Sequence, residues 1–323
     1  MNALLTAPAR RVQTLGPLGP PPLKSNSTAR GRAGAARVGQ VIHQVQEALV
    51  STRPVAFTPS RRPCPENRSV SSRLLALLDV FSADRSRMTL SEISRLTRVP
   101  LSTAHRLVGE LVAWGALERE ADGRYRIGLK LWEIGSLAPR GLPLREIALP
   151  LMEDLYEATH DNVQLSVREG AAILFVERLA GRDSVPTLTR VGGRFACHAT
   201  GGGLVLLAHA PSPVQEEVLS GPLQQFTRHT IGSSRDLRRV LAEARLKGFV
   251  ISDRQVTDDA LSVAAPVFDA RNQVIAALSL VVWYHDAQPS YLVPLVRSTA
   301  RSISRLLGSP ATRRPTGAVR THI

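Results

Sequence analysis

Four side chains that can donate hydrogen bonds lie close together in one short segment: Ser102, Thr103, His105 and Arg106. The guanidinium of an arginine matches the hydrogen-bonding edge of guanine, and hydroxyl groups suit phosphate oxygens. Three further arginines fit phosphates or the minor groove, namely Arg73, Arg124 and Arg126. These residue types predict contacts to double-stranded DNA, although any one exposed arginine is as often a solvated charge.

A second segment that could bind a ligand is the run Thr200-Gly201-Gly202-Gly203. If this run opens a helix, its backbone N–H groups can hold an anion such as a carboxylate. It lacks the lysine and the following serine or threonine of a phosphate-binding P-loop. The same glycines would equally suit a turn that packs closely against a neighbouring element, so the sequence leaves both interpretations open.

Catalytic and metal chemistry find little support in the sequence. Cys197, His198 and Asp253 could form a nucleophile–base set, but Cys197 precedes a predicted helix rather than lying on a nucleophile-bearing turn. The chain has two cysteines, Cys64 and Cys197, which disfavours a disulfide framework or a cysteine-built zinc site. Metal-ligand spacing is also missing from His209, His229 and His285. We therefore expect no catalytic residues, no metal and no cofactor.

The spacing of hydrophobic residues predicts the helices and strands that position the residues expected to contact DNA. Apolar residues recur at helical intervals over 70–81. Thr89 and Glu92 have the spacing of a capping box, which starts a second short helix. A third helix is expected over 102–114, capped by its first serine, with its apolar stripe inward and its polar residues outward. An Asp-Gly pair at 122–123 between two short extended runs predicts a hairpin, which completes a winged helix-turn-helix.

Helices and strands alternate irregularly over the rest of the chain. Helical patterns cover 129–138, 143–159, 198–208, 213–220, 236–247 and 292–307. Strand patterns cover 163–168, 172–178, 187–191, 249–252, 261–268 and 274–283. The last strand is almost entirely apolar and is expected at the centre of a sheet. This order predicts an α+β domain built on an antiparallel sheet.

The net charge of +14 is concentrated outside the predicted winged helix-turn-helix. Residues 1–68 carry ten basic and two acidic side chains, whereas residues 69–138 carry ten basic and eight acidic ones. The global charge therefore does not locate a DNA-binding surface. Residues 1–68 are rich in Pro, Gly, Ser and Arg and are expected to form a disordered basic tail, and 309–323 a second tail. No apolar run is long enough to predict a membrane span, so a cytoplasmic protein is expected.

Several motifs together resemble the family of isocitrate-lyase-regulator-type (IclR) transcription regulators. The winged helix of that family is similar to residues 90–93, 100–107 and 123–128. Its C-terminal half is similar, in order and spacing, to residues 191–193, 198–203, 263–269 and 276–279. The resemblance implies a GAF-like effector-binding domain, a homodimer or dimer of dimers, and a palindrome-like DNA operator. By position, it also implies an effector pocket that contains Gly201, Gly202, Ser252, Asp253, Ser262 and Ser279.

The chain departs from that family pattern at several positions of the implied pocket. Leu204 stands where members commonly have a lysine, and Val281 stands where a second serine is common. The segment 259–262 lacks the usual glycine and cysteine. A more apolar lining favours an effector that is larger or more aromatic than a two- or three-carbon acid.

These observations predict a DNA-binding transcription regulator, controlled by an organic or aromatic acid of a catabolic pathway, that is not an enzyme. The expected division is a winged helix-turn-helix over 69–128, a linker helix over 129–142 and an effector-binding domain over 143–308. Two alternatives stay open. One is a small-molecule-binding enzyme with an accessory winged helix, and the other is a scaffolding module that does not bind DNA.

Overall fold

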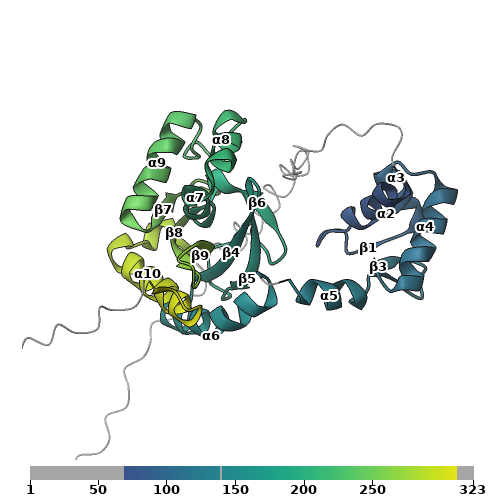
Figure 1. Cartoon of the computed structure of the whole chain (residues 1–323), viewed down its shortest axis with the longest axis horizontal. Coiled ribbons are helices and arrows are strands. Elements are labelled where there is room, and N and C mark those ends of the chain that lie inside the picture. The colour runs from purple at the N-terminus through teal and green to yellow at the C-terminus, as the bar shows by residue number, and fades with distance from the viewer. Residues whose placement is uncertain (1–68, 139, 311–323) are drawn as a thin grey trace, which may run out of the picture. The chain divides into compact units, whose positions relative to one another are not determined.

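A computed structural model describes residues 69–138 and 140–310 of the chain (Figure 1). The tail predicted over 1–68, and the tail predicted over 309–323 beyond Pro310, lie outside the described residues. The winged-helix region and the C-terminal region have separate hydrophobic cores, and each is described by itself. None of the helices in the described part of the chain is long and apolar enough to cross a membrane.

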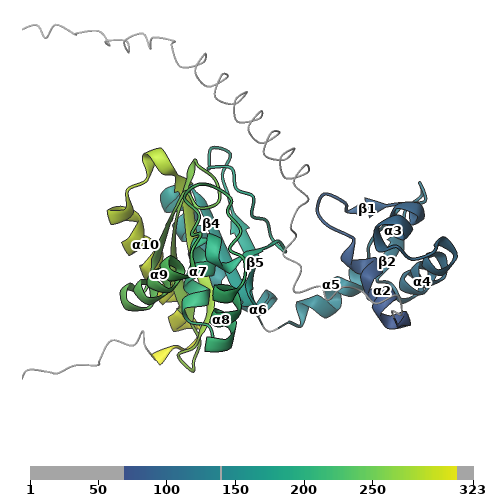
Figure 2. The same ribbon diagram turned by 90° about the horizontal axis from the view of Figure 1, so that it is seen from above.

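Three helices and a small antiparallel sheet form the first region, in the order predicted for a winged helix-turn-helix (Figure 2). The elements are α2 (Val70–Asp79), β1 (Arg87–Met88), α3 (Leu90–Thr97), α4 (Leu101–Trp114), β2 (Leu117–Arg119) and β3 (Tyr125–Ile127). The strand order is β1-β3-β2, so the hairpin gains a short third strand that sequence spacing did not predict.

Local signals fix the ends of these elements. Thr89 and Glu92 form the predicted reciprocal capping box at the start of α3. Gly115 ends α4 with a φ of 87°, and Gly123 turns the hairpin with a φ of 83°, both in the left-handed region that favours glycine. The predicted serine cap of α4 is wrong. The helix begins one residue earlier, at Leu101, and its N-cap is Pro100, so Ser102 lies in the first turn with its side chain free to face outward.

The inward stripe of α4 anchors this region. Leu107 is completely buried, and Ala104, Val108 and Leu111 lie on the same side of the helix. They pack with side chains of the other elements, among them Leu77, Ile93 and Leu117. A region of this size buries a small core, so each large apolar side chain contributes a substantial share of its stability.

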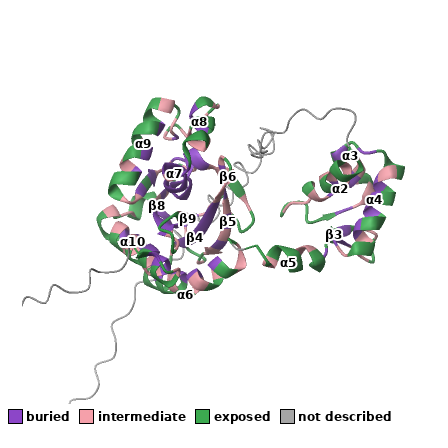
Figure 3. Ribbon diagram, in the orientation of Figure 1, coloured by how far each residue is buried: buried purple, intermediate pink, exposed green. Residues whose placement is uncertain are grey.

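Two helices follow the winged helix-turn-helix along the chain. They are α5 (Leu129–Ser136) and α6 (Leu142–Thr159). No residue of α5 is buried, and Leu129 and Trp132 are 74% and 65% exposed (Figure 3). In contrast, α6 buries a stripe of apolar residues against the C-terminal core.

The C-terminal region contains a six-stranded antiparallel sheet in the order β6-β5-β4-β9-β8-β7. Its strands are β4 (Asn162–Glu169), β5 (Ala172–Leu179), β6 (Arg194–Ala196), β7 (Val250–Asp253), β8 (Ala260–Phe268) and β9 (Val274–Trp283). Its helices are α6, α7 (Gly201–Ala208), α8 (Ser212–Ser220), α9 (Ser234–Lys247) and α10 (Pro289–Leu306). β9 lies between β4 and β8, which confirms the predicted central position of the most apolar strand.

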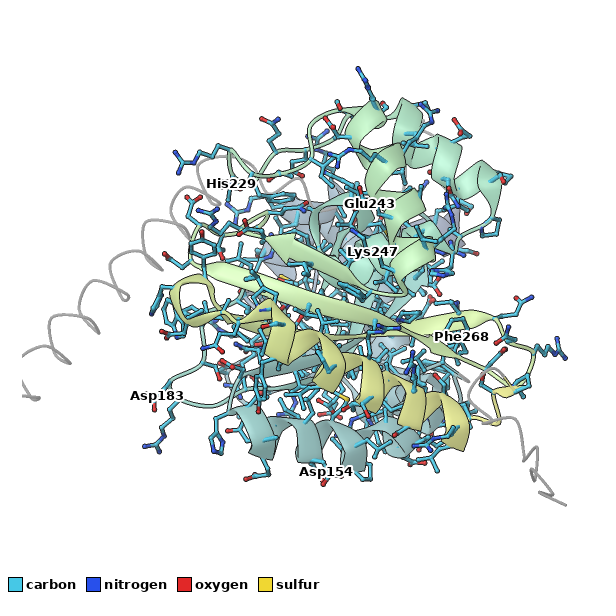
Figure 4. All side chains as sticks on the ribbon, turned by 90° about the vertical axis from the view of Figure 1, so that its left-hand side faces the viewer. Asp154, Asp183, His229, Glu243, Lys247 and Phe268 are labelled. Carbon is cyan, nitrogen blue, oxygen red and sulfur yellow. The ribbon has the colours of Figure 1, made fainter. Side chains whose placement is uncertain are left out.

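The sheet separates two layers of helices. α6 and α10 pack on one face, and α7 packs on the other with α9 outside it. Figure 4 shows these layers edge-on, with Asp154 of α6 on one side of the strands and Glu243 and Lys247 of α9 on the other. α7 is buried along its whole length because it lies between the sheet and α9 (Figure 3).

The structure differs from the predicted elements between β5 and α7. The strand predicted over 187–191 is absent, and a short strand, β6, forms at Arg194–Ala196 instead. Thr187 and Thr189 use their side-chain hydroxyls to bind each other and Gln164, so the segment is held without strand pairing. The predicted helix start at 198 is also wrong, because Cys197–Ala199 form a separate turn of 3₁₀ helix before α7.

Candidate functional site

The exposed face of α4 carries the polar residues predicted to contact DNA. Ser102, His105 and Arg106 are exposed, and Thr103 is partly exposed. The face is continuous because the apolar stripe points the other way, into the core. The described winged helix thus presents hydroxyl, imidazole and guanidinium groups from the first two turns of one helix, which is the arrangement that reads bases in the major groove.

Carboxylates neutralise two of the predicted DNA-binding arginines. Arg106 forms an ion pair with Glu110 one turn later on the same face of α4. Arg126 of β3 binds Glu118 at 2.8 Å, and this hydrogen bond raises the pKa of the guanidinium. Part of the hydrogen-bonding capacity of both guanidinium groups is therefore already used within the chain.

The other two predicted cations are less strongly held. Arg124, at the hairpin, lies 3.6 Å from Asp122 with half of its side chain exposed. Arg73 lies on α2 and is partly buried. The structure brings Arg124 and Arg126 onto one hairpin, but it places Arg73 on a different helix from the residues of α4.

A partly open cavity lies in the C-terminal region, beside the N-terminus of α7. Five of the six residues assigned by resemblance line it, namely Gly201, Gly202, Ser252, Ser262 and Ser279. The remaining lining is Gln164, Phe175, Thr187, Leu188, Thr189, Thr200, Gln255, Val256, Thr257, Ala260 and Val281. No charged side chain contributes to this lining.

Asp253 is the exception, and its assignment to the pocket is not supported. Its carboxylate accepts hydrogen bonds from Arg254 at 2.8 Å and 3.2 Å, and about half of its side chain is exposed. The guanidinium of Arg254 also lies 3.8 Å from the centre of the Tyr284 ring. Asp253 therefore orders the end of β7 and the following loop from outside the cavity.

The glycine run at 201–203 allows close packing against neighbouring residues, and it also leaves two backbone N–H groups without an acceptor in the helix. A Cβ on Gly203 would lie 2.4 Å from the carbonyl oxygen of Cys197, and one on Gly202 would lie 2.8 Å from Ser166 Oγ. Within the first turn, the N–H of Gly203 donates to the hydroxyl of Thr200. Helix geometry leaves the N–H groups of Gly201 and Gly202 without an intrahelical acceptor, and both residues line the cavity. The two interpretations of the sequence are thus compatible.

Sequence reasoning missed most of the polar lining. Gln164 lies in the alternating run Val163-Gln164-Leu165-Ser166, which predicts a side chain on an exposed polar face, whereas in the structure both faces of β4 are buried there. Its Nε2 donates to Thr189 Oγ1 at 2.6 Å. Gln255 and Thr257 lie in a loop, and no local periodicity marks a loop residue as part of a cavity.

The suspected nucleophile–base set does not have the properties of one. Burial raises the pKa of the Cys197 thiol to about 12, so the reactive thiolate is scarce at neutral pH. Burial also lowers the pKa of His198, and a 2.9 Å hydrogen bond to the carbonyl of Gln224 partly offsets this effect. His198 thus ties the turn before α7 to the segment between α8 and α9.

Comparison with known proteins identifies the class that combines these two regions. Residues 71–121 match the IclR helix-turn-helix domain, and residues 138–305 match the family described as bacterial transcriptional regulator IclR C-terminal. The chain is 31% identical over 242 residues to the HTH-type transcriptional regulator KipR of Bacillus subtilis, covering 72% of this chain and 95% of that one. It is 28% identical to the Pca operon regulatory protein of Acinetobacter baylyi, covering 73% and 88%.

A solved structure shows the same fold with a ligand. The crystal structure of an IclR homologue from Microbacterium hydrocarbonoxydans, complexed with 4-hydroxybenzoate, is 40% identical with a TM-score of 0.70. The match covers 74% of this chain and 99% of that chain. The class is therefore that of DNA-binding transcription regulators controlled by a small-molecule effector. This chain belongs to the IclR family of bacterial transcriptional regulators.

Proposed function

We propose that this regulator binds a double-stranded operator through α4 and the β2–β3 hairpin, and that an aromatic carboxylic acid in the C-terminal cavity controls this binding. Ser102, Thr103, His105 and Arg106 contact bases and phosphates in the major groove, while Arg124 and Arg126 contact the flanking backbone. Arg73 adds a phosphate contact. The family matches over 71–121 and 138–305 support a boundary between the DNA-binding and effector-binding domains within the predicted linker, 129–142.

The lining of the cavity carries the proposal for the effector. Phe175, Leu188 and Val281 supply an apolar wall, whereas the polar lining consists of hydroxyl and amide groups. The lining contains no lysine or arginine. The carboxylate of an effector can instead accept hydrogen bonds from the free N–H groups of Gly201 and Gly202, which lie at the positive end of the α7 dipole. The 4-hydroxybenzoate bound by the Microbacterium homologue is a molecule of this class. We propose Gly201, Gly202, Ser252, Ser262 and Ser279 as effector contacts.

Replacing Arg106 by alanine tests the DNA-binding surface. A duplex selected from random sequence by the full-length protein should bind the variant about 10- to 100-fold more weakly, because one base or phosphate contact is lost. Arg239→Ala is the matched control. That side chain is also exposed and paired with carboxylates, but it lies on α9 and its loss should leave the affinity unchanged.

The same binding assay tests effector control. Adding 4-hydroxybenzoate to the wild-type protein should change its affinity for the selected duplex, because an effector acts by binding two states of the protein unequally.

Unchanged affinity of the Arg106→Ala variant for the selected duplex would show that Arg106 takes no part in DNA recognition. The absence of any selected duplex would favour the scaffolding alternative.

Exposed apolar side chains on and directly after α5 support a homo-oligomer. Leu129, Trp132 and Ile134 of α5, and Leu137 at its C-terminal end, are all at least 48% exposed, and large apolar side chains gathered in one short segment favour contact with a second copy of the chain. A dimer would present two α4 helices to a palindromic operator. Sedimentation equilibrium that gave a monomer at micromolar concentration would contradict this.

We further propose a cytoplasmic regulator without enzymatic activity. Its relatives are named as transcriptional regulators, and the buried, neutral environment of Cys197 and His198 gives no activated nucleophile.

A further inference from the structure

We infer that Gln255 selects effectors that carry a hydrogen-bond donor, so that a hydroxylated aromatic acid binds more tightly than the same acid without its hydroxyl group. This inference rests on the proposed function, because it names the part of the cavity that distinguishes one aromatic acid from another.

The side-chain amide of Gln255 is an unusual element of the cavity wall. The residue is 9% exposed and lines the cavity, yet its Oε1 is buried without a hydrogen-bond partner. A buried amide oxygen without a donor is unfavourable, and such groups are rare in folded proteins. A ligand that supplies an O–H or N–H group relieves this cost when it binds.

The backbone around Gln255 is fixed although its side-chain oxygen is unpaired. The Thr230 hydroxyl donates to the carbonyl of Gln255 at 2.5 Å, and the Thr227 hydroxyl donates to the carbonyl of Arg254 at 2.6 Å. Arg254 itself is locked by Asp253 and by the Tyr284 ring. The side chain thus extends from an ordered loop into the lining of the cavity.

Two other polar side chains of the lining already have partners. Gln164 donates its Nε2 to Thr189, and the Thr200 hydroxyl accepts from the N–H of Gly203. Beside the serine hydroxyls, the cavity therefore offers free donors at the start of α7 and a buried, unpaired acceptor on Gln255, in the loop between β7 and β8. This pair matches a molecule with a carboxylate at one position and a donor at another.

Calorimetric titration of Gln255→Leu and wild type with matched acids tests the inference. The probes are benzoate and 4-hydroxybenzoate, then phenylacetate and 4-hydroxyphenylacetate. In wild type, the affinity for at least one hydroxylated acid should be about tenfold or more above that for the matching acid without the hydroxyl group. The acid without the hydroxyl group leaves the buried acceptor, Gln255 Oε1, unpaired. The leucine variant should lose this preference and bind the unhydroxylated acids as well as wild type does. Gln225→Leu, an exposed glutamine outside the lining, should keep it.

Thermal unfolding without ligand separates recognition from a structural role. Leucine has a similar volume and no polar group, so Gln255→Leu should melt at or above the wild-type temperature. A lower melting temperature would overturn the inference, and so would a preference that is absent in wild type or survives in the variant. If none of the four acids bound wild type, the proposed effector class would be wrong. If the acids bound without a preference for the hydroxyl group, only the inference about Gln255 would be wrong.

Discussion

Replacing Gly203 by alanine is expected to destabilise the C-terminal region by about 3 kcal/mol or more, at the upper end of overpacking effects. The added Cβ would lie 2.4 Å from the carbonyl oxygen and 2.7 Å from the Cα of Cys197. Both are backbone atoms, so no side chain can rotate away to relieve the contact. Residue 203 also lies in the first turn of α7, whose buried side chains form the centre of one core layer.

Urea unfolding followed by circular dichroism measures this loss. Gly109→Ala is the matched control, because Gly109 also lies within a helix but a Cβ there meets nothing within 4 Å. Alanine favours helix more than glycine does, so the control should be neutral or stabilise by up to about 1 kcal/mol. Equal stability of the Gly203 variant and wild type would show that the turn before α7 can shift freely.

Replacing Leu107 by alanine is expected to cost about 2–5 kcal/mol, because it leaves a cavity in the core of the winged helix-turn-helix. Leu107 is fully buried and lies in the middle of α4, between the other elements of this small region. A loss of this size is comparable with the whole stability of a domain with a small core. The variant should therefore lose DNA binding while it retains binding of aromatic acids.

Leu101→Ala provides the comparison on the same helix. Leu101 is 52% exposed, so its truncation should change the unfolding free energy by less than about 0.5 kcal/mol. Intrinsic tryptophan fluorescence, to which Trp114 at the end of α4 contributes, together with operator affinity would follow the two variants. A Leu107 variant that bound the selected duplex normally would contradict the assigned core.

Much of the fold could be predicted because local chemistry and hydrophobic spacing agree. The capping box of Thr89 and Glu92, the glycine that ends α4 and the apolar run of β9 are each specified within a few residues. The prediction failed where tertiary contacts determine the backbone. The segment 187–191 has a strand-like composition, but hydroxyl groups that bind Gln164, distant in sequence, hold it as a loop.

The candidate sites also differ in whether local sequence or tertiary contacts determine them. The outward residues of α4 follow from helical periodicity, because burying one stripe exposes the other. Their ion pairs could have been suspected, since Arg106 and Glu110 are four residues apart. The glycine run at 200–203 indicated one end of the cavity from its residue types, and resemblance to a family supplied further positions. Five of the six residues assigned by resemblance line the cavity, whereas Asp253 does not. Gln255 could not be recognised from sequence, because only the folded structure shows that its Oε1 is buried without a hydrogen-bond partner.

The neutral lining of the cavity has a consequence for how the regulator responds to ionic strength. Binding to phosphates releases condensed counterions and weakens steeply as salt is added. Interactions inside a cavity without charged side chains are screened much less. Raising the salt concentration should therefore weaken operator binding far more than it weakens binding of the effector.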